Sequence, residues 1–249
     1  MNRDHGSGFI AFLSILALPI ALGAALIAWP SSVQFANEDP QRDGYVQPRS
    51  IGNLIAQAQE STVTIWCETK SESWLGTAWA IDLDTEFSKK YPTTLITNHH
   101  VIEDCTNGKG KILVALPWQN KRPAIIVKWD RKNDLAVVAT KTHYPTLALS
   151  SSRPSPGYWV MAIGSADSYE GSIAFGNVLN VTKSDLLVTN NLSHGNSGGP
   201  LIDNEGNVVG VTTWGSKKEQ YNGAKSLDAF CRKILDCEFD KGKSWWDWD

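Results

Sequence analysis

Short runs of apolar or alternating side chains recur along most of the chain, with turn-forming residues between them. The runs cover residues 61–68, 75–82, 93–97, 111–116, 122–129, 134–139, 157–163, 172–180, 186–190, 199–202, 208–214 and 224–227. Gly, Pro, Asn and Asp lie between the runs, as is typical of strands joined by tight turns. Runs this short and this closely spaced favour all-β barrels over β-α-β units.

A Pro-rich segment at residues 150–157 divides these runs into two sets and is the predicted connection between two barrels. We expect a domain over residues 55–230, with a first barrel at about 55–148 and a second at about 157–228. A linker over residues 37–54 precedes this domain, and a tail rich in Cys and Trp follows it over residues 231–249.

The run from His194 to Leu201, His-Gly-Asn-Ser-Gly-Gly-Pro-Leu, places one hydroxyl, that of Ser197, among small residues that let a substrate approach the backbone. A serine nucleophile needs a base within hydrogen-bond reach and a third group that orients the base. Upstream, the chain offers His100 and Asp134. The run also fits the Gly-x-Ser-x-Gly elbow of α/β-hydrolases, but that fold requires its His after the serine, and all five histidines precede Ser197.

Three segments resemble the triad motifs of trypsin-like serine proteases, and most of all those of the bacterial HtrA-like branch. They are Thr-Asn-His-His-Val at residues 97–101, Asn-Asp-Leu at 133–135, and Gly-Asn-Ser-Gly-Gly-Pro-Leu at 195–201. The resemblance covers about residues 55–230 and implies an all-β fold of two Greek-key β-barrels with the active site in the cleft between them. It also implies that His100 is the general base, Asp134 its orienter and Ser197 the nucleophile of a serine endopeptidase. His99 is the rival base, but in the family the catalytic imidazole directly precedes the Val.

The same resemblance extends to substrate contacts. It implies that the backbone N–H groups of Gly195 and Ser197 form the oxyanion hole, so that a branched residue at Gly195 silences the enzyme without unfolding it. Substrate-binding residues are then Thr213, Trp214 and Gly215 on one strand, with Asn191 and Leu192 at the primary pocket. Since no carboxylate lies at Asn191, we expect apolar rather than Lys or Arg side chains before the cleaved bond.

Two departures from the family's better-known members are visible. Asn196 stands where the digestive enzymes carry an Asp, so activation by a newly cut amino terminus is not expected. HtrA-like proteins usually continue into a PDZ domain, whereas the sequence after Gly215 is too short for one, so we expect none.

The segment at residues 9–29 carries no charged side chain and is long enough to cross a bilayer as a helix. We expect residues 1–36 to hold a single transmembrane anchor. The alternative is a signal peptide cut near Ala36. With a retained anchor, the protease domain lies outside the cytoplasm, in the periplasm or extracellular space. With cleavage, the protein is secreted.

The four cysteines fit export. Cys67 lies in the first predicted strand and Cys105 shortly after His100, so we expect these two to pair, and Cys231 to pair with Cys237. Four buried thiols remain the alternative.

The composition limits the kinds of partner that the chain is expected to bind. A net charge of -3 gives no basic footprint for nucleic acid. Metal-ligand spacing and phosphate-binding loops are absent from the sequence, so we expect no cofactor and no metal, and a polypeptide as substrate. The sequence leaves the oligomeric state open. A rival function is a membrane-tethered binding or sensor module that keeps the protease fold with little or no turnover.

Overall fold

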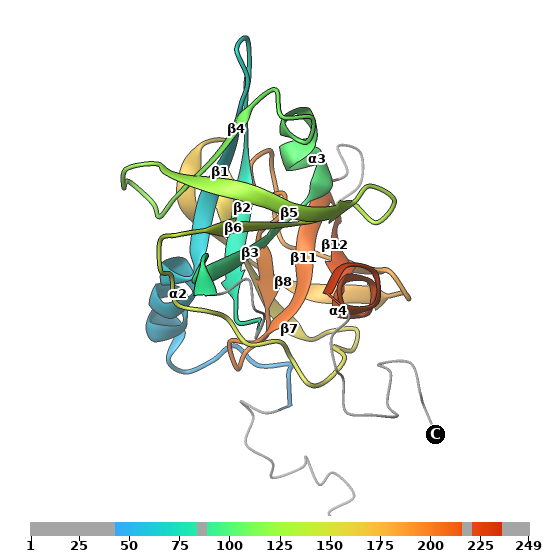
Figure 1. The fold of residues 1–249 in the computed structure, drawn as a ribbon. Coiled ribbons are helices and arrows are strands. Elements are labelled where there is room, and N and C mark those ends of the chain that lie inside the picture. The colour runs from blue at the N-terminus through green and yellow to red at the C-terminus, as the bar shows by residue number, and fades with distance from the viewer. Residues whose placement is uncertain (1–42, 84–88, 216–220, 236–249) are drawn as a thin grey trace, which may run out of the picture. The chain divides into compact units, whose positions relative to one another are not determined.

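The computed structural model describes residues 43–83, 89–215 and 221–235. Twelve strands form two closed barrels (Figure 1). The first barrel contains β1 (Thr62–Glu68), β2 (Ser73–Ile81), β3 (Thr93–Thr97), β4 (Lys111–Ala115), β5 (Arg122–Asp130) and β6 (Leu135–Thr140). The second contains β7 (Trp159–Ala166), β8 (Tyr169–Val181), β9 (Asp185–Val188), β10 (Pro200–Ile202), β11 (Val208–Gly215) and β12 (Asn222–Ser226). The prediction of an all-β fold with two barrels is confirmed, and each predicted run overlaps one strand.

Both barrels have the same strand order, and all their pairings are antiparallel. The order around the first is β1-β2-β3-β6-β5-β4, and around the second it is β7-β8-β9-β12-β11-β10. In each barrel the fourth strand lies beside the first, and the third pairs with the sixth. This is the Greek-key arrangement.

Three groups of buried side chains hold these barrels. One fills the first barrel and includes Ile65 and Leu95. Another fills the second and includes Leu186 and Leu201. The third joins the barrels, because it combines outward-facing residues of both with helix α4 (Leu227–Phe230), as where Trp79 lies 6.0 Å from the ring of Phe230.

Helices occur at the margins of the barrels. Helix α2 (Ile51–Glu60) begins within the segment expected as a linker, and the side-chain amide of Gln59 donates to Gly171 O at 2.7 Å. Helix α3 (His99–Ile102) and the short 3-10 helix η2 (Glu103–Cys105) follow β3, and η3 (Cys231–Leu235) follows α4. Within the described ranges, no helix is both long and apolar enough to cross a membrane. The predicted anchor at residues 9–29 lies outside those ranges.

A disulfide joins Cys67 in β1 to Cys105 in η2, with the Cα atoms 5.9 Å apart, as predicted. It links the segment just after α3 to the first barrel. Cys231 is buried in the core between the barrels. Its predicted partner Cys237 and the tryptophans of the tail lie outside the described residues, so that pairing stays a prediction.

Candidate active site

The two adjacent histidines have different environments because a helix begins at them. Strand β3 ends at Thr97, Asn98 is extended, and α3 starts at His99. One helical step turns neighbouring side chains in different directions. His99 is buried, whereas the side chain of His100 is 46% exposed.

Asp134 lies just before β6 and holds His100 through two contacts. Its Oδ2 lies 2.7 Å from His100 Nδ1, and its Oδ1 accepts from His100 N at 2.9 Å. An ionised carboxylate only accepts hydrogen bonds, so Nδ1 carries the proton and Nε2 is left as an acceptor in the neutral ring. The structure therefore brings these two predicted residues together in the geometry that a general base requires.

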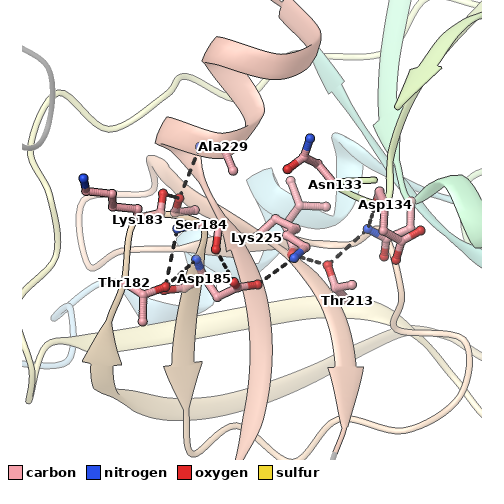
Figure 2. A network of polar contacts seen from close by, with 12 residues as sticks. Asn133, Asp134, Thr182, Lys183, Ser184, Asp185, Thr213, Lys225 and Ala229 are labelled. Carbon is pink, nitrogen blue, oxygen red and sulfur yellow. Dashed lines mark hydrogen bonds and ion pairs between the residues drawn. The ribbon is translucent and has the colours of Figure 1, made fainter. Parts of the chain in front are cut away.

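The backbone of Asp134 has a φ of 53°, a left-handed conformation that non-glycine residues adopt rarely. Asn98 supports it, since its side-chain amide donates to Asp134 O at 2.7 Å and to Thr213 Oγ1 at 3.1 Å. Figure 2 shows Asp134 and Thr213 at one end of a polar network that continues through the ion pair between Lys225 and Asp185, at 2.7 Å, towards Thr182 and Ala229. Asn98 thus ties the first barrel to β11 of the second.

Ser197 lies in the loop between β9 and β10, which turns sharply at two glycines. Gly195 and Gly198 have φ values of 95° and 87°. A Cβ at Gly195 would lie 2.1 Å from Ser165 O, and one at Gly198 would lie 2.3 Å from Thr77 O. Both positions therefore require glycine on two grounds, conformation and space.

The hydroxyl of Ser197 donates to Thr213 O at 3.3 Å. Ser197 and His100 line the same cleft, but the hydrogen bonds among the described residues include none between them. Such contacts are often long in unliganded sites and tighten when substrate binds. The N–H groups of Gly195 and Ser197 have no acceptor among the described residues.

The cleft has a volume of about 610 Å³. Besides His100, Gly195 and Ser197, it is lined by Ser73, Trp74, Leu75, Val101, Asp167, Ser168 and His194. Sequence reasoning missed the contributions of β2 and of the β7–β8 turn. Asp167 and Ser168 both have positive φ and form a two-residue hairpin turn. The sequence signal for this turn is weak because neither residue is glycine or Asn. Trp74, 53% exposed, carries no sequence signal that marks it as a cleft residue.

The predicted substrate-binding residues lie outside that cleft lining. Asn191 is exposed, and Leu192 packs partly against the core of the second barrel. Thr213 is buried, and a Cβ at Gly215 would lie 3.5 Å from Leu192 O, so the end of β11 lies next to the predicted pocket loop. The side chain of Trp214 is outside the described part. Across the described ranges, no group of three or more His, Cys, Asp or Glu side chains is arranged to hold a metal ion.

Comparison with known proteins shows the family to which the chain belongs. Residues 76–211 match the family model of the trypsin-like peptidase domain. The chain is 35% identical over 130 residues to a probable periplasmic serine endoprotease, DegP-like, from Chlamydia pneumoniae, which covers 48% of this chain and 26% of that protein. It is 28% identical over 220 residues to the serine endoprotease DegS of Salmonella typhimurium, which covers 82% of this chain and 61% of that protein.

The crystal structure of a serine endoprotease from Yersinia pestis has the same fold, with a TM-score of 0.65 at 23% identity, over 80% of this chain and 70% of that one. This chain spans about a quarter of the length of the chlamydial relative. The family match covers more than half of the chain and includes the segments that carry His100, Asp134 and Ser197. The chain therefore belongs to the trypsin-like peptidase family.

Proposed function

We propose that this protein is a serine endopeptidase that hydrolyses polypeptides through His100, Asp134 and Ser197. The observation that carries the proposal is the pair of contacts from Asp134 to His100, at 2.7 and 2.9 Å, beside a cleft that His100 shares with Ser197. A carboxylate on Nδ1 leaves Nε2 free to face the hydroxyl, which is the arrangement that activates serine.

In the first step, Ser197 Oγ attacks the substrate carbonyl and His100 Nε2 takes the hydroxyl proton. The ring becomes an imidazolium that Asp134 stabilises. His100 then gives the proton to the leaving amine, and the C–N bond breaks to leave an acyl-enzyme ester on Ser197. Water repeats the sequence, with His100 again as base, and releases the acid. To begin, the hydroxyl must leave its contact with Thr213 O, a rotation about one side-chain bond.

The oxyanion of each tetrahedral intermediate is placed against the N–H groups of Gly195 and Ser197. Their lack of an acceptor within the described residues supports this role, because donors must be available where charge develops. The loop glycines let the backbone turn these groups inward.

The side chain preceding the cleaved bond is proposed to enter the region of Asn191, Leu192 and the end of β11. No carboxylate is found at Asn191, so an apolar side chain is favoured over Lys or Arg. Residues after the cleaved bond are proposed to contact Trp74 and Leu75, which line the cleft beside Ser197.

The catalytic domain is proposed to work outside the cytoplasm, held by residues 9–29 as a membrane anchor. The uncharged stretch supports the anchor. The Cys67–Cys105 disulfide supports an oxidising compartment, and the curated chlamydial relative is named as periplasmic.

The test is covalent labelling of the full chain, purified in detergent, by a fluorophosphonate. We expect labelling of the unmodified chain and its loss in Ser197→Ala and His100→Ala. Asp134→Asn should keep the fold but lower kcat by about 10⁴-fold, because a neutral amide no longer fixes the tautomer of His100. His99→Ala, which changes the other imidazole, is the matched control for the base.

A well-folded, disulfide-bonded chain that takes no label would contradict the proposal. That result would favour the binding or sensor module, with the hydroxyl of Ser197 kept on Thr213 O.

A further inference from the structure

Thr77 in β2 contacts the serine loop from the opposite barrel. Its side chain is fully buried, and its Oγ1 donates to Gly195 O at 2.6 Å while its N–H donates to Ser197 O at 2.9 Å. Oγ1 also accepts from Ser165 N at 3.0 Å, and Thr77 O accepts from Thr97 Oγ1 at 2.7 Å. Every polar atom of Thr77 is therefore in use, and two of its bonds reach backbone carbonyls of the loop that bears the nucleophile.

These carbonyls matter because each peptide unit is planar and trans, so its C=O and N–H point in opposite directions. A partner that holds the carbonyl also aims the N–H of the next residue. Asp167 N holds His194 O at 2.6 Å, which directs the N–H of Gly195. Thr212 Oγ1 holds Asn196 O at 2.6 Å, which directs the N–H of the nucleophile.

The peptide between Gly195 and Asn196 joins these two units. Its N–H donates to Ser193 O at 3.2 Å, and its carbonyl bonds to Thr77 Oγ1 at 2.6 Å. Gly195 has the weakest backbone preference of any residue type, so only such contacts fix this peptide. If it rotates, ψ of Gly195 and φ of Asn196 change, and the flanking N–H groups keep their directions only as far as the contacts at His194 O and Asn196 O resist that change.

We propose that Thr77 is a positioning residue for the oxyanion hole, whose hydroxyl lets the first barrel set the direction of the two N–H groups supplied by the second. This inference rests on the proposed function, since it assigns a task within that reaction. Its consequence is that charge stabilisation by the second barrel depends on a hydrogen bond that the first barrel donates.

Thr64 in β1 provides a matched control within the same polar cluster. Its side chain is also buried, and its Oγ1 lies 2.7 Å from Ser165 Oγ. Among the described residues, Thr64 makes no hydrogen bond to the loop from Gly195 to Gly198. Thr64→Val thus removes a buried hydroxyl one contact away from Thr77 without touching the loop.

The experiment compares Thr77→Val, Thr77→Ser and Thr64→Val in the full chain, with active sites counted by fluorophosphonate labelling. The readouts are kcat and KM for a peptide substrate and the Ki of a matching peptide aldehyde, whose hemiacetal with Ser197 places an oxygen in the oxyanion hole. We expect Thr77→Val to lower kcat and aldehyde affinity by about 10- to 100-fold with little change in KM. Thr77→Ser, which keeps the hydroxyl, should restore both to within about threefold, and Thr64→Val should leave both near the unmodified values.

Unchanged kcat and Ki in Thr77→Val would overturn the proposal. So would equal losses in Thr64→Val, which would show that any buried hydroxyl in the cluster matters equally, or equal losses in Thr77→Ser. Should Thr77→Val not fold, Thr77→Ala is the second variant without the hydroxyl, and the same outcomes apply to it. An unmodified chain that takes no label overturns the proposed function itself, and that failure is recognised before any variant is compared.

Discussion

At the scale of single residues, Gly195 carries both a conformational and a spatial demand. Its φ is 95°, and an added Cβ would lie 2.1 Å from the backbone oxygen of Ser165, which cannot yield as a flexible side chain would. The resemblance implies that a branched residue here silences the enzyme without unfolding it. The clash predicts a stability cost as well, so we expect Gly195→Ala to lose labelling and at least about 2 to 3 kcal/mol of unfolding free energy.

Gly108 is the control for that experiment. Its φ is 70°, and an added Cβ would meet nothing within 4 Å. Gly108→Ala therefore pays only for the left-handed conformation, about 1 to 2 kcal/mol. Urea unfolding of both variants measures the difference, and equal losses would mean that the loop moves away from Ser165 at no cost.

The residues proposed as catalytic could be identified from the sequence because each lies in a local motif whose order along the chain is informative. Thr77 could not, since its role depends on a hydrogen bond to a loop more than a hundred residues later. The place of Trp74 in the cleft could not be predicted either, because only the packing of the two barrels against each other brings it into the same cleft as Ser197.

At the scale of elements, the disulfide holds the segment after α3 to β1. It closes a separation of 38 residues, for which the chain-entropy model gives a stabilisation of about 4 kcal/mol. We expect the double variant Cys67→Ala/Cys105→Ala to lose roughly that amount in urea unfolding. Below the unfolding transition it should still be labelled, because Val101 and Ile102 of α3 remain buried in the first barrel.

The comparison for that variant is the unmodified chain under non-reducing conditions. A loss below about 1 kcal/mol would show that the reduced, unfolded chain is already compact. Loss of labelling in a folded double variant would show instead that the disulfide itself positions His100.

The strands were predictable because each barrel strand is a short run of apolar or alternating residues with turn-forming residues at both ends. Helix α2 was not predicted, although Ile51, Leu54, Ile55 and Ala58 recur at helical spacing and the last is buried. The helix was missed because its first residues were assigned, together with the polar stretch before them, to a linker. The β7–β8 turn also escaped prediction, because Asp167 and Ser168 adopt positive φ without the glycine that usually marks such turns.

At the scale of the whole molecule, two barrels could be inferred from the number and grouping of strands, but the interface between them could not. The core that joins them is built from outward-facing residues such as Ile96 and Val137, which read in the sequence as ordinary strand positions. In both barrels buried residues occupy successive strand positions, as in β3 and β6 of the first and β7 of the second, so periodicity alone does not separate the inner from the outer face.

The proposed membrane anchor gives a prediction for the entire chain. Residues 9–29 have no charge, and Arg near the centre of a spanning helix costs about 2.5 to 3.5 kcal/mol per residue. We therefore expect Leu16→Arg/Leu22→Arg to shift the protein from the carbonate-resistant membrane pellet to the soluble fraction. The control adds the same two charges at exposed positions of the barrels, Val127→Arg/Leu179→Arg, and should stay in the pellet.

The amino terminus of the purified chain decides between a retained and a cleaved segment. A terminus at Met1 or Asn2 together with a pellet location fits the anchor, because the uncharged stretch then remains joined to the barrels. A terminus near Asn37 and an unmodified chain in the soluble fraction would contradict the anchor and identify the segment as a signal peptide, whose removal releases the protease domain. Both outcomes require export of the chain. The Cys67–Cys105 disulfide should therefore form in cells in either case, and it should be lost only in a double Arg variant that stays in the cytoplasm.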